Sequence, residues 1–177
     1  MHKTAFRHGL LAAAIIILFI VVFYFLFSPK TLLDLGEAFG YAVMVIAMSM
    51  VFIGIKRYRD NELNGYISFG KAFGMGVYIA FIGSFIYGIF EGIFYEASDF
   101  KEIYIDFYMD KIQSSGQSPE VIQQQINQFN QDMAMWDSAF SMGLIMFLTV
   151  LILGTVIALI SAFILKKKQP EKIIAQN

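Results

Sequence analysis

The stretch AFGMGVYIAFIGSFIYGIFEGIFY, residues 72–95, decides the fold. Glu91 is its single charged side chain. A helix that crosses the hydrocarbon core of a bilayer, about 30 Å thick, needs about 20 apolar residues at 1.5 Å of rise each. The stretch therefore predicts a membrane-spanning helix.

Three further stretches have the same character and carry no charge at all: residues 9–27, 38–55 and 139–165. Helices of a soluble domain would keep a polar face, and these do not. The first stretch follows basic residues as a signal peptide would, but bulky Tyr24 to Phe27 stand where a small-residue cleavage site would lie. We expect four retained spans in one all-α polytopic membrane domain, residues 1–177.

Composition supports this class and excludes others. Apolar residues make up 58% and charged residues 15% of the chain, against roughly 45–50% and 25% in soluble domains. The net charge of −1 predicts no nucleic-acid partner. The chain has no cysteine, which excludes disulfides, thiolate metal sites and cysteine nucleophiles.

Basic residues gather beside particular ends of the spans. Ten of the 13 lysines and arginines flank the spans on one side, which the positive-inside rule assigns to the cytoplasm together with both termini. We expect some of them to attract anionic inner-leaflet lipid, at about 1 kcal/mol each. The ten are Lys3, Arg7, Lys56, Arg57, Arg59, Lys71, Lys166, Lys167, Lys168 and Lys172. The lipid-binding candidates are Lys56, Arg57, Arg59, Lys166, Lys167 and Lys168, the last three in a basic tail over residues 166–177.

Residues 96–138 are too long for a structureless loop, and their apolar residues recur at helical spacing. Residues 114–117 interrupt the pattern, and Ser118, Pro119 and Glu120 then follow the order of a helix start. We expect an external hairpin of two amphipathic helices, the first continuing from the third span. Their apolar stripes would pair with each other or with a neighbouring subunit. The stripes are Phe100, Ile103, Tyr104 and Phe107, then Ile122, Ile126, Phe129, Met133 and Trp136, the last near the membrane entry.

Asp99, Glu102, Asp106 and Asp110 share one face of the first hairpin helix. This face is a candidate surface for a cation or a basic partner. The alternative is a solvated acidic face that helps to set topology, because a calcium site needs a compact loop of converging oxygens.

The third span carries small residues at regular spacing. Such residues let helices approach closely in lipid, where packing drives association. They predict close contacts inside the bundle or, alternatively, a homodimer interface. The residues are Gly76, Ala80, Gly83, Ser84, Gly88 and Gly92.

Glu91 shares this small-residue face, so it should point into the bundle. An ionisable residue inside a membrane is a functional candidate by default. It lies only about 6 Å from the outer end of the span, so a structural role or snorkelling to interfacial water is the alternative. Lys30 and Lys101 are candidate partners on the same side.

Several short motifs together resemble a known family. They are Phe6-Arg7-His8-Gly9, the basic loop from Gly54 to Asp60, and Ile67-Ser68-Phe69-Gly70-Lys71-Ala72-Phe73 with the glycines that follow. With the long external loop, they resemble the bacterial domain-of-unknown-function family 4199, up to about Lys168. The resemblance implies a four-span protein of the bacterial cytoplasmic (inner) membrane. It implies no activity, cofactor or catalytic residue.

Intramembrane catalysis needs a nucleophile with its base, paired carboxylates or a metal cluster. One glutamate supplies none of these, so we expect no enzyme and no cofactor. The leading hypothesis is a non-enzymatic scaffold, accessory subunit or homo-oligomer with a membrane-protein partner. The alternative is a small transporter or channel component that uses Glu91 for proton or ion coupling, with Tyr78, Tyr87 and Tyr95 nearby in sequence.

Overall fold

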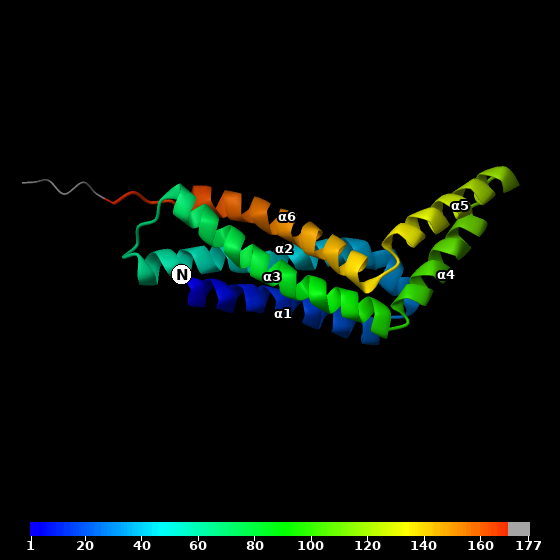
Figure 1. The fold of residues 1–177 in the computed structure, drawn as a ribbon, viewed down its shortest axis with the longest axis horizontal. Helices are drawn as coiled ribbons and strands as arrows, with labels where there is room; N and C mark the ends of the chain where they lie inside the picture. Colours follow the sequence, from blue (N-terminus) through cyan, green and yellow to red (C-terminus); the bar gives the residue numbers. More distant parts are fainter. Residues whose placement is uncertain (170–177) are drawn as a thin grey trace, which may run out of the picture.

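The computed structural model describes residues 1–169, and within that range it leaves the side chains at positions 29, 30, 32, 37, 135 and 136 undescribed. The predictions made for the side chains of Lys30, Trp136 and Lys172 therefore lie outside the described part. The described chain is built from helices (Figure 1). They are α1 (His2–Leu26), α2 (Pro29–Glu62), α3 (Phe69–Ala97), α4 (Phe100–Gln113), α5 (Pro119–Trp136) and α6 (Ala139–Leu165).

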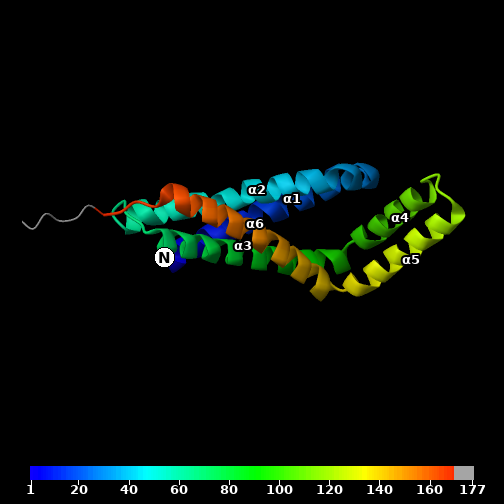
Figure 2. The ribbon, with the colours of Figure 1, turned by 90° about the horizontal axis from the view of Figure 1, so that it is seen from above.

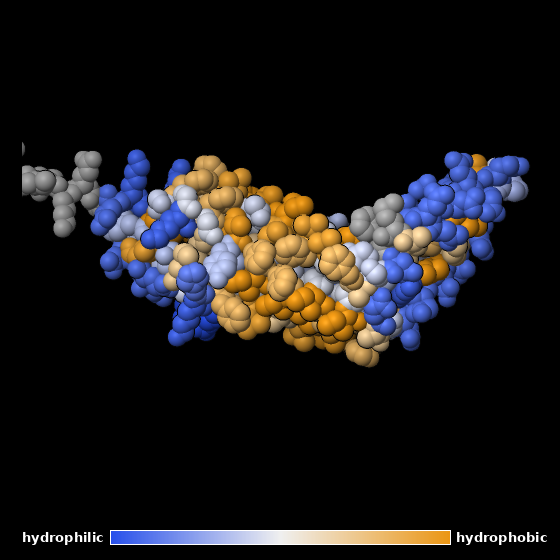
Figure 3. Space-filling view, viewed as in Figure 1, coloured by the Kyte–Doolittle hydropathy of each residue, from blue (hydrophilic) through white to orange (hydrophobic). Residues whose placement is uncertain are grey.

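Within the described part, α1, α2 from Ala38, α3 and α6 are long and apolar enough to cross a membrane. Large apolar side chains such as Leu18 and Ile152 point away from the bundle and are exposed. On the face shown in Figure 3, an apolar band covers the middle of the bundle, and polar residues cover both ends of the molecule. Apolar surface of this extent needs hydrocarbon as its solvent. The prediction of an all-helical, multi-pass membrane protein is confirmed.

Three helices begin earlier than the expected spans, α3 by only three residues, at Phe69. The first starts at His2 rather than at residue 9, and α2 starts at Pro29 rather than at residue 38. The cause at α2 is local, because Pro29 is pre-set for the first helical turn and the Ser28 hydroxyl accepts from the Thr31 N–H at 3.4 Å. The bundle therefore has only a short break between its first two helices.

The third helix lies at the centre of the bundle and packs against α6, α1 and α2. The backbones of α3 and α6 approach each other closely, since a Cβ built on Gly88 would lie 2.7 Å from the Gly143 carbonyl oxygen. Toward the other end, a Cβ on Gly76 would lie 2.6 Å from the Ala158 Cβ. We call this contact the α3–α6 seam; it fixes the two helices along most of their length.

The hairpin of α4 and α5 extends from one end of the bundle (Figures 1 and 2). The expectation that its first helix continues from the third span is wrong, because the backbone is extended at Ser98 (φ −119°, ψ 164°). The Ser98 hydroxyl donates to the Phe94 carbonyl at 2.7 Å and accepts from the Phe100 N–H at 3.3 Å. It thus ends one helix and supports the start of the next.

The two hairpin helices pair through aromatic rings, with Phe129 of α5 stacked near Tyr104 and Tyr108 of α4 at centroid distances of 6.3 and 6.1 Å. Serines stand at the starts of α3 and α5, and the sequence predicted the second of these starts. Ser68 accepts from the Lys71 N–H at 3.4 Å at the start of α3. Ser118 stands at the N-cap of α5 with Pro119 in the first turn, but its hydroxyl makes no capping bond.

Candidate functional site

A pocket of about 690 Å³ lies where the helices separate at the hairpin end of the bundle. The pair α1 and α2 diverges there from the pair α3 and α6 (Figure 2). Residues from all the described helices, α1 to α6, line the pocket, those of the hairpin included. Its size falls within the roughly 300–1,000 Å³ range of small-molecule sites.

Glu91 lines this pocket from α3 and is only 8% exposed. The Tyr87 side chain, one turn earlier on the same helix, interacts with its carboxyl group. The carboxyl oxygen Oε2 is buried and has no hydrogen-bond partner among the described residues. Burying such an oxygen without a hydrogen bond costs several kcal/mol in apolar surroundings. Glu91 is thus a buried acid with unused hydrogen-bonding capacity.

Tyrosine hydroxyls supply most of the other polar groups of the pocket. Tyr87 and Tyr95 are each 2% exposed, and the Tyr95 hydroxyl also has no hydrogen-bond partner within the described chain. Thr149 of α6 lines the same space. Tyr78, grouped with these tyrosines from sequence, lies far from them, beside His2 with ring centroids 5.5 Å apart. The structure therefore brings two of the three tyrosines together with Glu91.

The rest of the lining is aromatic and methionine-rich. Sequence reasoning missed this set, because its members come from different helices and no short motif joins them. The regular spacing of aromatic residues along α1 was the sequence signal that could have indicated part of this lining. The aromatic members outside α3 are Phe19, Phe23, Tyr24, Tyr41, Phe100, Tyr104, Tyr108 and Phe129, and the methionines are Met44, Met133, Met142 and Met146.

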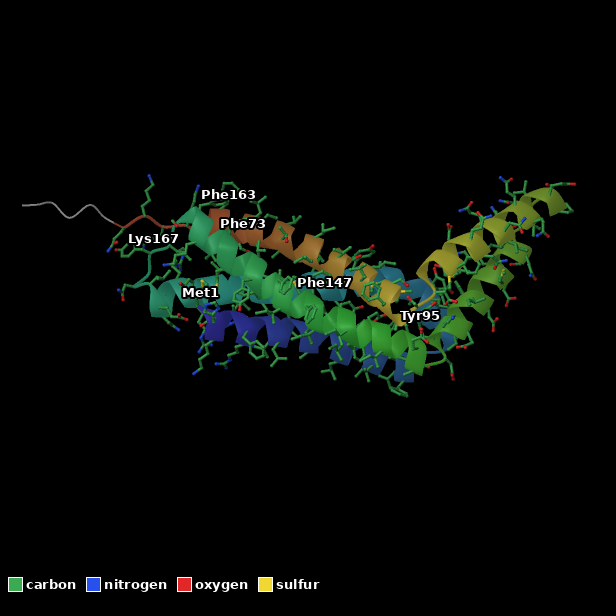
Figure 4. The ribbon with its side chains drawn as sticks, in the orientation of Figure 1. Met1, Phe73, Tyr95, Phe147, Phe163 and Lys167 are labelled. Carbon is green, nitrogen blue, oxygen red and sulfur yellow. The ribbon has the colours of Figure 1, made fainter. Side chains whose placement is uncertain are left out.

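Polar contacts join the two segments of the chain that form the base of the hairpin. Figure 4 labels Tyr95, which lies at this junction. Lys101 forms an ion pair with Asp137 and lies 5.8 Å from the centre of the Tyr95 ring. The hydrogen bond to Asp137 raises the pKa of Lys101 above its ordinary value. Glu96 accepts from the Ala139 N–H at 3.1 Å. Lys101, a candidate partner of Glu91 from sequence, is thus engaged by Asp137.

The small residues of the third span lie inside the bundle. Gly76, Gly88 and Gly92 contact α6, while a Cβ on Gly83 would lie 3.2 Å from the Gly9 carbonyl oxygen of α1. Ala80 and Ser84 are fully buried. This face is filled by helices of the same chain, which leaves it no room for a second copy.

The acidic residues of α4 are exposed, and Asp106 and Asp110 line a shallow depression of about 600 Å³ with Asp34 and Lys111. Asp99 stands at the start of the helix and makes no side-chain capping bond. Among the described residues, no group of three or more His, Asp or Glu side chains is placed to hold a metal ion.

The basic residues at the end of the bundle opposite the hairpin differ in exposure and in their contacts. Lys56, Arg57 and Lys168 are exposed, as lipid contact would require. The Arg59 side chain is only 18% exposed and donates to the Leu165 carbonyl at 3.3 Å, at the end of α6. Lys167 bonds through its backbone to Ile67 and lies over the Tyr66 ring, and Lys166 lies over the Phe163 ring. Arg59 therefore has a structural role within the chain.

His8 is a buried polar residue to which sequence reasoning gave no role. It is 3% exposed, and its Nδ1 lies 2.7 Å from the Thr4 carbonyl oxygen. A Cβ on Gly54 of α2 would lie 3.1 Å from the imidazole ring. The missing side chain at Gly54 thus makes space for the ring, in a part of the bundle separate from the pocket.

The fold and pocket define a class: a four-span membrane protein with a helical hairpin at one end of the bundle and a buried acid in a pocket beside it. Residues 7–167 match the model of the family described as Protein of unknown function (DUF4199), and the chain belongs to this family. Comparison with curated proteins and with solved structures finds no match.

Proposed function

We propose that the protein is non-enzymatic and acts as a small transporter or channel component, with the pocket around Glu91 as its working site. The observation that carries this proposal is the buried, unpartnered Oε2 of Glu91 facing a pocket of about 690 Å³. A carboxyl group held in this way can take up a proton or a cation and release it when its surroundings change. One carboxyl with neighbouring tyrosines suits binding and exchange better than covalent catalysis.

The surroundings of Glu91 favour exchange over a purely structural role. A structural carboxylate would have its oxygens satisfied by partners in the bundle, whereas Oε2 has none among the described residues. Snorkelling would bring the carboxyl group to the surface, whereas this one is 8% exposed.

Proteoliposomes loaded with a pH-sensitive dye test the proposal. After an imposed pH gradient, wild-type protein should collapse the gradient faster than protein-free liposomes, and Glu91→Gln should return the rate to the protein-free value. Glu102→Gln is the matched control, because it removes an exposed carboxylate of α4 that does not line the pocket. Equal rates for wild type and Glu91→Gln would refute the proposal.

Association is the second candidate: a scaffold, accessory subunit or homo-oligomer in the bacterial inner membrane, with both termini in the cytoplasm. The hairpin favours it, because this element extends past the bundle and exposes Asp99, Glu102, Asp106 and Asp110. Native co-purification of the full chain with and without Asp106→Asn and Asp110→Asn would test it. A strictly monomeric protein that recovers no partner would remove its support.

A further inference from the structure

We infer that the pocket around Glu91 takes a hydrophobic organic cation, an ammonium- or phosphonium-type ion with an apolar body. The inference rests on the proposed function and names the ligand class for the same site.

The charge of the lining is the first argument. Glu91 and Asp132 are its acids, and none of the described residues that line it is Lys, Arg or His. Asp132 is exposed and accepts from the Gln128 side chain at 2.9 Å, so it lies toward the outside of the pocket. The nearest cation on the hairpin base, Lys101, is paired with Asp137. The described lining therefore holds acidic groups and no basic side chain, which favours a cation and disfavours an anion.

The aromatic lining is the second argument. Rings from several helices line the same pocket as Glu91, among them Phe23 and Tyr24 of α1, Tyr41 of α2 and Phe94 of α3. Aromatic faces attract organic cations, and the attraction is stronger when the site excludes water. A carboxylate combined with several rings is the arrangement that recognises an ammonium group and its apolar substituents together.

Competing ligand classes fit less well. A metal ion needs several converging oxygen ligands, and no group of three or more acidic or histidine side chains is placed for one within the described chain. A neutral acyl chain would fill the space but leave Oε2 of Glu91 without a partner. The flexible methionines Met44, Met142 and Met146 let the lining adapt to cations of different shape.

Two ions of the same shape and opposite charge provide the test. Tetraphenylphosphonium and tetraphenylborate are each measured by equilibrium dialysis against the full chain in mild detergent. The cation should bind wild-type protein at least about tenfold more tightly than the anion. Glu91→Gln should lose most of this preference, and Glu120→Gln should keep it, because Glu120 is exposed and does not line the pocket.

A second variant covers the case in which Glu91→Gln does not fold. Tyr41 is 53% exposed and lines the pocket, so Tyr41→Leu removes a ring face at small structural cost. It should weaken phosphonium binding severalfold while the protein keeps its elution volume and melting temperature. Equal binding of both ions, or cation binding unchanged in both variants, would overturn the inference. Co-purification of a neutral lipid, with no binding of the phosphonium ion, would also overturn the inference.

The outcomes separate the two proposals. Phosphonium binding without proton flux would uphold the ligand class and refute Glu91-linked exchange. Flux that depends on Glu91, together with no preference between the two ions, would uphold the exchange and refute the ligand class.

Discussion

Gly88 and Gly143 face each other across the α3–α6 seam so closely that a single added carbon on either meets the other's backbone. A Cβ on Gly143 would lie 2.6 Å from the Gly88 carbonyl oxygen. A backbone atom in a packed helix cannot move aside as a flexible side chain can. Close packing in lipid depends on such contacts, because apolar burial drives no association there.

Gly88→Ala should therefore destabilise the protein, by about 1–3 kcal/mol as overpacking usually does. Gly74→Ala on the same helix is the matched control, since nothing lies within 4 Å of its Cβ position. Alanine has a higher helix propensity than glycine, so Gly74→Ala should be neutral or stabilise the protein by up to about 1 kcal/mol. Unfolding of both variants in mixed micelles measures the difference, and equal effects would contradict the tight seam.

The sequence predicted that Gly88 and its neighbours at four-residue spacing would lie in a close helix contact. It could not predict that the partner is α6, because the spacing describes one helix and says nothing of the other. The same limit applies to Glu91, whose inward direction followed from its helical face. The pocket in front of it depends on side chains of distant elements, such as Tyr41 and Phe129.

At the scale of elements, short polar sequences decide where helices begin and end. Ser28 and Pro29 start α2 in the way that Ser118 and Pro119 start α5. The second pair was used to predict a helix start, and the first carried the same signal. The break at Ser98 had no comparable signal, because an extended serine between two helical patterns depends on hydrogen bonds to both.

The start of α6 depends on a reciprocal pair of serines. Ser138 accepts from the Ser141 N–H at 3.1 Å, and the Ser141 hydroxyl accepts from the Ser138 N–H at 3.2 Å. Ser138→Ala should cost about 1 kcal/mol. Hydrogen exchange in the first turn of α6 should then speed up about fivefold.

Ser118→Ala is the control for this experiment. Its hydroxyl also stands at an N-cap but makes no capping bond, so exchange at the start of α5 should change much less. If both substitutions speed exchange equally, the reciprocal pair does not stabilise α6.

At the scale of the whole molecule, the helices pack tightly at one end of the bundle and leave a pocket at the hairpin end. Gly9, Gly54 and Gly154 let α1, α2, α3 and α6 approach one another away from the hairpin. Toward the hairpin, the two helix pairs diverge, and rings and methionines such as Phe19, Phe23 and Met44 line the space between them (Figure 2). Length and hydropathy were enough to predict four spans. The divergence depends on the matching of small and large residues across helices, which no single stretch reveals.

Orientation is a property of the whole chain, and it decides which side of the membrane the pocket adjoins. The basic residues predict that the end of α6 is cytoplasmic and the hairpin external, which would place the Glu91 pocket in the outer half of the bilayer. The chain has no cysteine, so single cysteines at Gln117 and Lys168 can be labelled without background. Both positions are exposed. In intact cells an impermeant maleimide should label Gln117→Cys alone, and after permeabilisation it should label both. Labelling of Lys168→Cys alone would invert the topology, so that a ligand would reach Glu91 from the cytoplasmic side.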